Sequence, residues 1–311
     1  MMTSSSAPGK IILFGEHAVV YGRPALAVPV TQVQATATVS ENSRGGVWIE
    51  APNIALSSAL SQLAPDHPLV AVINSVFSTL SITRPPACTI YLQSTIPVAS
   101  GLGSGAAVSV AIIRALSAFL GQPLSDPQVN GLAFQAEKLY HGTPSGIDNT
   151  VVTYARPVYF VKGQPIKTFR VGASFTLVIG DTGICAPTKE SVGAVRRLRE
   201  ADPTRWEKVF SQVGEIVWDA RQAIERGDTA ALGTLMDANH ALLQEMTVSC
   251  AELDLLTEAA HKAGALGAKL SGGGRGGNMI ALVLKEKAST MAETLLAAGA
   301  KRTIITTVRA R

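Results

Sequence analysis

The sequence contains few cysteines, few aromatic residues and few charged residues. Only three of its 311 residues are cysteine, 5% are aromatic and 16% are charged. The cysteines, Cys88, Cys185 and Cys250, lie far apart and lack the short spacing of metal ligands. Isolated thiols in an odd number are typical of a reducing compartment, so we predict neither a disulfide nor a zinc site and expect a cytoplasmic protein.

Long uninterrupted apolar runs are also absent. The longest candidate, residues 106–120, is interrupted by Arg114 and falls short of the roughly 18 residues that a membrane-spanning helix needs. Residues 1–7 form a short serine-rich tail without the basic and apolar regions of a secretory signal. We therefore predict a soluble protein with no membrane partner.

The charge distribution predicts no nucleic-acid partner. The chain has a formal net charge of +4 and a pI near 9, but its lysines and arginines are scattered. The one basic cluster, Arg196, Arg197 and Arg199, has helical spacing beside Glu200 and Asp202, which is typical of a solvated helix face. A mild positive charge also suits an anionic small substrate.

The hydrophobic patterning predicts an α+β protein. The chain is 47% hydrophobic, which is enough for one large core or two ordinary ones. Alternation and β-branched residues predict strands at residues 11–14, 34–39, 47–50, 87–92, 158–161, 175–179, 279–284 and 303–308.

Helical patterning predominates after residue 189. Start signals stand at Asp202, at Asp228 and at Ser249, the last in a capping box with Glu252. The change of pattern predicts two domains, 1–183 and 184–311.

A glycine-rich segment, IPVASGLGSGAA at residues 96–107, follows a strand-like run and precedes an apolar helix. Gly101, Gly103 and Gly105 allow a ligand to approach the backbone, and the free N–H groups of the following helix favour an anion. The segment is not a Walker A loop because no Gly-Lys-Ser/Thr follows, and its third glycine is misplaced for a Rossmann loop. Taken alone, it fits an anion site or a structural turn.

Two carboxylates follow the glycine-rich segment. Glu137 lies on a helix predicted to begin at a capping box of Ser125 with Gln128, and Asp148 follows eleven residues later, after a turn-rich link. Such carboxylates can converge, one to hold a divalent cation and one to act on a substrate hydroxyl. Read separately, Glu137 could be an exposed helix residue and Asp148 a helix cap.

The segment APGKIILFGEHAVVYG, residues 7–22, places charged groups beside an apolar strand. Lys10 opens the apolar run, and Glu16 and His17 follow it in a turn. Burying these groups is costly unless they meet partners or a substrate. The alternative is an edge strand with polar ends at the surface.

Together these segments resemble the GHMP kinases, a family named for galactokinase, homoserine kinase, mevalonate kinase and phosphomevalonate kinase. PGKIILFGEHAVVYG is similar to the family's first motif in its mevalonate kinase form, IPVASGLGSGAA to the second, and KLSGGGRGGNMIAL, residues 269–282, to the third. EKLYHGTPSGIDN, residues 137–149, is similar to the segment that bears the metal-binding glutamate and the catalytic aspartate. The motifs follow the family order across nearly the whole chain.

The resemblance implies roles for individual residues. Asp148 would accept the proton of the substrate hydroxyl as its oxygen attacks the γ-phosphorus of ATP, and Lys10 would contact both groups. Glu137 and Ser104 would bind Mg²⁺. The nucleotide would contact Pro97, Ser100, Gly101, Leu102, Gly103, Ser104, Gly105 and Ala106. The substrate would contact Glu16, His17, Ser145, Gly146 and Gly273, with His17 on the carboxylate or a hydroxyl of mevalonate.

The implied fold has an N-terminal domain resembling domain 2 of ribosomal protein S5 and a ferredoxin-like, helix-rich C-terminal domain. The implied activity is ATP-dependent phosphorylation of the 5-hydroxyl of mevalonate in isoprenoid biosynthesis. The alternatives are phosphomevalonate kinase, another family kinase acting on a related small alcohol, and a ligand-sensing relative without turnover. Retention of both Lys10 and Asp148 argues against the last. A homodimer stays open.

Two positions depart from the family pattern. Gly105 stands where the second motif has a serine that bonds metal or phosphate, so Ser104 or water would have to take that role. Arg275 stands in the third motif where a small residue is usual. It could add a phosphate contact or point to solvent.

Overall fold

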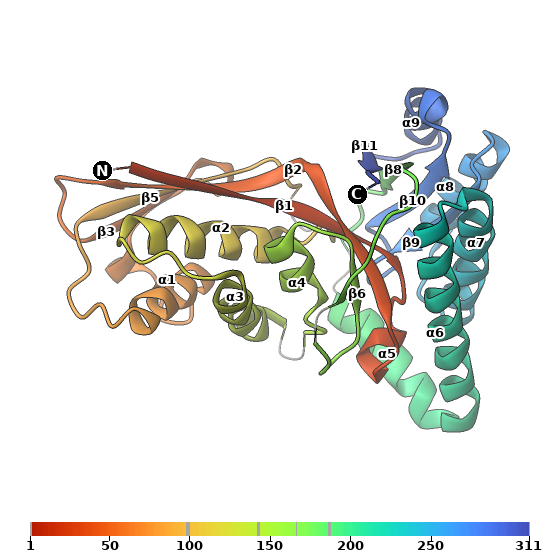
Figure 1. Ribbon diagram of the computed structural model, residues 1–311, viewed down its shortest axis with the longest axis horizontal. Coiled ribbons are helices and arrows are strands. Elements are labelled where there is room, and N and C mark those ends of the chain that lie inside the picture. The colour runs from red at the N-terminus through yellow and green to blue at the C-terminus, as the bar shows by residue number, and fades with distance from the viewer. Residues whose placement is uncertain (1, 98–99, 142–143, 166, 186–187, 311) are drawn as a thin grey trace. The chain divides into compact units, whose positions relative to one another are not determined.

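The computed structural model describes residues 2–97, 100–141, 144–165, 167–185 and 188–310. The chain divides into two compact units, and strands β1 (Met2–Phe14) and β2 (Ala25–Glu41) contribute residues to both (Figure 1). The first unit comprises Met1–Lys10, Pro29–Val98 and Leu102–Ala155, and the second Ile11–Val28, Ala99–Gly101 and Arg156–Arg311. The domain boundary predicted after residue 183 falls within the second unit and stays a prediction. None of the described helices is long and apolar enough to cross a membrane.

In the first unit a sheet has the order β4-β3-β5-β2, with β1 paired to β2. The remaining strands are β3 (Val47–Ala51), β4 (Leu56–Ala59) and β5 (Cys88–Ser94), of which β3 and β5 run parallel. Alternation puts three fully buried side chains opposite one another across the sheet, because Ile90 pairs with both Val39 and Ile49. The strands predicted here are confirmed, whereas β4 was not predicted.

Strand β1 begins nine residues earlier than the apolar run predicted. The prediction of a serine-rich tail is wrong because these small hydroxyl side chains form bonds across the sheet. Ser4 Oγ lies 3.0 Å from Thr38 Oγ1, Ser6 Oγ lies 2.8 Å from Thr36 Oγ1, and Thr3 Oγ1 donates to a carbonyl of the covering helix at 2.9 Å. A polar composition is therefore compatible with a strand whose hydroxyl groups are paired.

Four helices lie on one face of this sheet (Figure 1). They are α1 (Pro68–Thr79), α2 (Ser104–Phe119), α3 (Asp126–His141) and α4 (Ile147–Tyr154). Helix α2 is buried around most of its circumference because it packs against β5 and against the other three helices. At the start of α3, Gln128 Oε1 accepts from the backbone N–H of Ser125 at 3.0 Å, which is one half of the predicted capping box.

The second unit contains an antiparallel sheet of order β11-β8-β10-β9. Its strands are β8 (Phe175–Asp181), β9 (Gly267–Ser271), β10 (Asn278–Val283) and β11 (Arg302–Val308). The short strands β6 (Val158–Phe160) and β7 (Lys167–Thr168) pair with each other, and β6 pairs with the first residues of β2. Strand β9 was not predicted.

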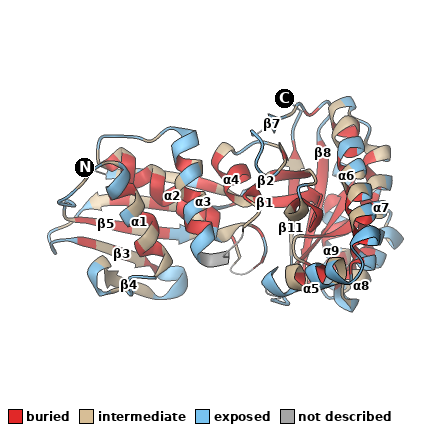
Figure 2. Cartoon of the chain, turned by 90° about the horizontal axis from the view of Figure 1, so that it is seen from below, coloured by how far each residue is buried: buried red, intermediate tan, exposed pale blue. Residues whose placement is uncertain are grey.

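Helices α5 (Thr188–Ala201), α6 (Pro203–Arg226), α7 (Thr229–Glu245), α8 (Ala251–Lys262) and α9 (Ala288–Ala297) complete this unit. Short 3₁₀ turns occur at Ala18–Tyr21, Pro52–Ile54, Leu60–Gln62 and Lys285–Lys287. Figure 2 shows that the buried residues follow the strands and one side of each long helix.

The helix starts predicted at Asp202 and Asp228 are confirmed, because both side chains accept from a backbone N–H three residues on, each at 3.0 Å. The capping box predicted for Ser249 is wrong. The N-cap of α8 is Cys250, without a side-chain bond, and Ser249 Oγ instead donates to Asp254 at 2.5 Å. A capping residue displaced by one position can still satisfy an acidic side chain of the first turn.

Helix α7 and strand β9 approach each other through two glycines. A Cβ atom at Gly233 would lie 2.0 Å from the carbonyl oxygen of Leu266, and one at Gly267 would lie 2.2 Å from the carbonyl oxygen of Gly233. Both obstacles are backbone atoms, so no side chain can move aside. This contact fixes the distance between β9 and α7.

We predict that Gly233→Ala destabilises the protein by about 3 kcal/mol or more, because the added methyl group must push the strand away from the helix. The matched control is Gly131→Ala on the exposed side of α3, where a Cβ would meet nothing within 4 Å. That change should leave stability unaltered or raise it by about 0.5–1 kcal/mol, because alanine favours a helix. Urea unfolding followed by circular dichroism measures both, and equal stability of the two variants contradicts the prediction.

Candidate active site

In the first unit the glycine-rich segment leads directly into α2. Gly103 is the N-cap of the helix with φ +73°, and the N–H of Ala107 donates to the carbonyl of Gly103 at 2.9 Å. The N–H groups of Ser104, Gly105 and Ala106 therefore have no acceptor within the helix. They lie at the helix start where the sequence predicts an anion site. Residues 98 and 99 of this segment lie outside the described residues.

Lys10 crosses the glycine-rich segment at close range. Its N–H donates to the carbonyl of Leu102 at 2.9 Å, and its side chain passes so near Gly103 that a Cβ there would lie 2.9 Å from Lys10 Cγ. The lysine is 4% exposed. Only glycine leaves room for this side chain and also adopts the required positive φ.

The buried ammonium group of Lys10 reaches a carboxylate. Lys10 Nζ lies 2.9 Å from Asp148 Oδ1, and the Asp148 side chain is 31% exposed. Asp148 stands in the first turn of α4, where the positive end of the helix favours an anion. Gly146 is the N-cap of this helix, and Ser145 Oγ accepts from the N–H of Ile147 at 3.3 Å. Ser145 and Gly146 thus shape the turn that presents Asp148.

Glu137 on α3 is the third charged group in this place. It is 5% exposed, and burial first, followed by the nearby charge of Asp148, raises its pKa to about 7, while Lys10 acts in the opposite direction. A Cβ at Gly105 would lie 3.3 Å from Glu137 Oε1, so the carboxylate lies beside the start of α2. The structure therefore brings Lys10, Asp148, Glu137 and residues 102–107 of the glycine-rich segment together within the first unit.

The same place suits a magnesium ion. The described residues contain no group of three or more His, Cys, Asp or Glu side chains that could hold a metal by themselves. Magnesium does not need one, because it is usually bound by one or two carboxylates together with phosphate oxygens and water. Glu137 and Asp148 are two carboxylates near the ammonium of Lys10, and Mg²⁺ would add positive charge beside them.

In the second unit a sharp turn follows β1 and carries Glu16 and His17. Gly15 begins it with φ +95°, and a Cβ there would lie 2.4 Å from the carbonyl oxygen of Pro24. His17 itself has φ +61°, which is rare for a residue with a side chain. Glu16 and His17 are 1% and 5% exposed. Strained backbone of this kind persists only where the surrounding contacts determine it.

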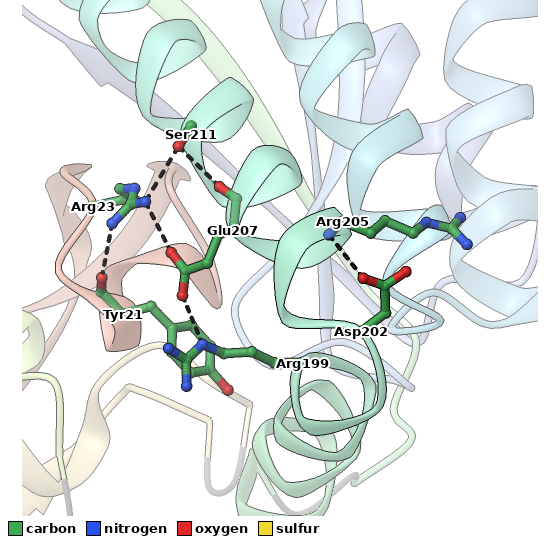
Figure 3. Close-up of polar contacts among 7 residues, drawn as sticks. All are labelled: Tyr21, Arg23, Arg199, Asp202, Arg205, Glu207 and Ser211. Atoms are coloured by element: carbon green, nitrogen blue, oxygen red, sulfur yellow. Dashed lines mark hydrogen bonds and ion pairs between the residues drawn. The ribbon is translucent and has the colours of Figure 1, made fainter.

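Figure 3 shows the contacts that hold the far end of this turn. The guanidinium of Arg199 lies 5.3 Å from the centroid of the Tyr21 ring. The same ring stacks on Phe210 of α6, which the figure does not draw, with 4.4 Å between centroids. Glu207 accepts from Arg23 at 2.9 Å and from Arg199 at 2.7 Å. The basic cluster on α5 is therefore not only a solvated face, because Arg199 takes part in this network.

The near end of the turn is held by the segment that contains β9. The side chains of Lys269 and Glu16 are both fully buried and form an ion pair, and Lys269 Nζ also donates to the carbonyl of Leu270 at 2.6 Å. Ser271 Oγ donates to the carbonyl of Ile12 at 2.8 Å. Glu16 Oε2 is buried and has no hydrogen-bond partner among the described residues.

His17 is anchored by one ring nitrogen. Its Nε2 lies 3.0 Å from the carbonyl oxygen of Gly273, so this nitrogen donates and the neutral ring keeps a lone pair on Nδ1. Nδ1 is buried without a partner among the described residues. Burial first, and then the charges of Arg275 and Lys269, lower the pKa of His17 to about 4. His17 is therefore neutral near pH 7, and its Nδ1 can only accept a hydrogen bond.

One departure from the family pattern, Arg275, and the residues that sequence reasoning missed lie in the third motif. Arg275 has φ +59°, and its Nε donates to the carbonyl of Thr247 at 3.3 Å, so the side chain is tied to the backbone. Lys269 was not predicted, nor was Asn278, whose amide donates to the carbonyl of Ser100. The rule that singled out Lys10, a lysine within an apolar run, would also have found Lys269.

Comparisons with known proteins agree with these motifs. The family model for the GHMP kinases N terminal domain matches residues 69–156, and the one for the GHMP kinases C terminal matches residues 220–301. The mevalonate kinase of Thermococcus gammatolerans is 37% identical over 320 residues, which cover 96% of this chain and 94% of the relative. That of Thermococcus onnurineus is 36% identical over 322 residues with the same coverage.

Among solved structures, the L. major mevalonate kinase in complex with R-mevalonate is 31% identical, with a TM-score of 0.87. The match covers 99% of this chain and 96% of that chain. The predicted family and the predicted two-domain α+β fold are confirmed. The chain therefore belongs to the GHMP kinase family, in which it groups with the mevalonate kinases.

Proposed function

We propose that the protein is a mevalonate kinase, which transfers the γ-phosphoryl group of ATP to the 5-hydroxyl of mevalonate. The observation that carries the proposal is the pair of Lys10 and Asp148 beside the start of α2, in a chain whose curated relatives are mevalonate kinases. Membership of a kinase family implies the use of ATP.

The first unit supplies groups for phosphoryl transfer. As the hydroxyl oxygen attacks the γ-phosphorus, the bond to the departing ADP oxygen breaks and Asp148 takes the hydroxyl proton. Lys10 neutralises charge on Asp148 and on the reacting oxygen, and the N–H groups of residues 104–106 bind phosphate oxygens. Glu137 and Ser104 would hold Mg²⁺, which neutralises phosphate charge when it is bound.

The second unit supplies groups for recognition of the substrate. Glu16 Oε2 and the neutral Nδ1 of His17 are both acceptors, so they suit a hydroxyl group rather than a carboxylate. The sequence had left the carboxylate and the hydroxyl open for His17, and the tautomer favours the hydroxyl. A hydroxyl group donates a single hydrogen bond, so we assign the tertiary hydroxyl of mevalonate to Glu16 Oε2 and keep His17, Ser145, Gly146 and Gly273 as further substrate contacts.

Several finer assignments remain part of this proposal. They are the cytoplasmic location, a homodimer, the absence of nucleic-acid and membrane partners, and the nucleotide contacts of residues Pro97 to Ala106. A ligand-sensing relative is disfavoured because binding without turnover requires no proton acceptor at Asp148.

We predict that ADP release with ATP and Mg²⁺ is fastest, at limiting substrate, with mevalonate among mevalonate, phosphomevalonate, galactose and homoserine. The physical reason is that a buried acceptor of the second unit matches a tertiary hydroxyl, which galactose and homoserine lack, and that Asp148 needs a free 5-hydroxyl, which phosphomevalonate lacks. A coupled assay gives kcat/KM for each compound. Preference for another compound overturns the substrate, and no turnover with any of them favours the sensing relative.

We predict that Asp148→Asn lowers kcat at least ~10²-fold, because an amide cannot take the hydroxyl proton. ATP affinity should change little, since the phosphates contact the helix start and not Asp148. The matched control is Asp126→Asn, which also replaces an acid in the first turn of a helix but lies in an exposed pair with Arg114. Single-turnover kinetics with nucleotide binding by calorimetry separates the effects, and near-normal turnover of Asp148→Asn excludes it as the base.

We predict that His17 contributes to acid sensitivity. The unfolded chain binds a proton at His17 below about pH 6.5, whereas the folded protein binds it only near pH 4. Stability is therefore lost as pH falls from 6.5 to 4, by about 3 kcal/mol at most. In urea unfolding between pH 4 and 8, His17→Gln should lack this part of the loss, and the control His261→Gln, at an exposed position, should retain it. An unchanged slope in His17→Gln contradicts the assignment.

A further inference from the structure

The ion pair of Lys269 and Glu16 has a feature that a purely structural pair would not need. Both side chains are fully buried, which carries a large desolvation cost for each charge. Lys269 Nζ bonds one carboxylate oxygen and the carbonyl of Leu270, whereas the other carboxylate oxygen has no partner among the described residues. A buried acceptor without a partner is costly, so its retention points to a ligand that donates to it.

The neighbouring His17 shows the same arrangement. Its Nε2 is bound to the carbonyl of Gly273, and its Nδ1 is buried without a described partner. Two consecutive side chains thus each have one atom fixed by the segment 269–273 and one acceptor left over. The positive φ of His17 is fixed between these anchors and the Tyr21 network. In both side chains a contact on one atom therefore orients the acceptor on the other. For Glu16 that contact is made by Lys269.

We propose that Lys269 is a positioning residue for the kinase reaction: it holds Glu16 turned so that its second oxygen accepts a hydrogen bond from the tertiary hydroxyl of the substrate. The inference rests on the proposed function. Lys269 is the first residue of the third motif. The proposal gives it a part in substrate recognition that is separate from binding of the nucleotide and its phosphates.

The physical reason for a lysine lies in the charge that it supplies. Without the ammonium group, the carboxylate loses the partner that fixes its first oxygen and stays buried at a high desolvation cost, so the direction of its second oxygen is no longer set. The other charged or titratable groups around the pair are His17 and Arg275 on one side and His240 on the other, where Lys269 contributes to a lowered pKa of His240. Asp237 and Asp254 also lie near His240, and their negative charges raise its pKa.

A double-mutant cycle on the full-length enzyme tests the inference. Lys269→Met and Glu16→Gln should each raise the KM for mevalonate at least ~10-fold, with a smaller effect on kcat, because a hydrogen bond to a charged acceptor is lost. The double variant, which has a neutral pair of similar size, should be no worse in kcat/KM than Glu16→Gln alone. A loss in the double variant equal to the product of the single losses shows that Lys269 acts independently of Glu16 and overturns the inference.

A matched control separates positioning of Glu16 from a general effect of removing a lysine. Lys262→Met removes an exposed lysine from an ion pair with Glu258 and should have the KM and kcat of the wild type. A rise in the KM for mevalonate in Lys262→Met equal to that in Lys269→Met overturns the inference.

A substrate without the tertiary hydroxyl, 5-hydroxy-3-methylpentanoate, completes the test. The wild type should prefer mevalonate at least ~10-fold, and Lys269→Met should show a smaller preference. An unchanged preference overturns the role. If Lys269→Met does not fold, comparison of the double variant with Glu16→Gln decides in the same way, since equal kcat/KM supports the role and a further loss contradicts it. The wild-type rate with mevalonate reports separately on the proposed function.

Discussion

A buried charge has to be paired where it lies, and this constraint determines the local structure around both sets of functional residues. Lys10 in the first unit and Lys269 in the second are almost completely removed from water. Each is tolerated because a carboxylate, Asp148 or Glu16, lies against it. The two pairs differ in exposure, since Asp148 keeps part of its surface in solvent and Glu16 keeps none. That difference suits a proton acceptor in one case and a fixed acceptor in the other.

The positions of several glycines follow from these pairs. Gly103 is required because the stem of Lys10 lies where its side chain would be, and Gly15 is required because the turn that carries Glu16 presses against the backbone of residues 24 and 25. In both places the glycine removes an obstacle so that a charged side chain can reach its partner. Each of these glycines therefore combines a positive φ with a close contact to a neighbouring segment, and both features exclude a side chain.

Much of the first unit could be predicted from local pattern. Apolar alternation locates β3 and β5, and the glycine-rich segment followed by an apolar run locates α2, because each signal lies within a few neighbouring residues. Glu137 was placed on the correct helix for the same reason, whereas α4, which carries Asp148 in its first turn, was not predicted. The early part of β1 was missed because its hydroxyl side chains are satisfied by another strand, which a local pattern cannot show.

Glu16 and His17 were named from the family resemblance, but their partner Lys269 was less accessible to prediction. Strand β9 is short and contains both a glycine and a charged residue, Lys269, so it has none of the composition typical of a strand. The charge becomes acceptable only through Glu16, which no local pattern connects to it. The capping box at Ser249 failed for a related reason, because the competing partner, Asp254, lies five residues on, two beyond the usual spacing of three.

The long separation of these partners along the chain has a consequence for synthesis. Glu16 pairs with a lysine 253 residues later, and His17 bonds a carbonyl 256 residues later. Because the chain is made from its N-terminus, the ribosome makes residues 15–17 long before it makes either partner. Its strained backbone and its charged groups can therefore take up their final arrangement only after nearly the whole polypeptide has emerged. Late closure of such distant contacts is slow and leaves apolar strand segments exposed in the meantime, so folding of this chain in the cell should depend more on chaperones than its regular core suggests.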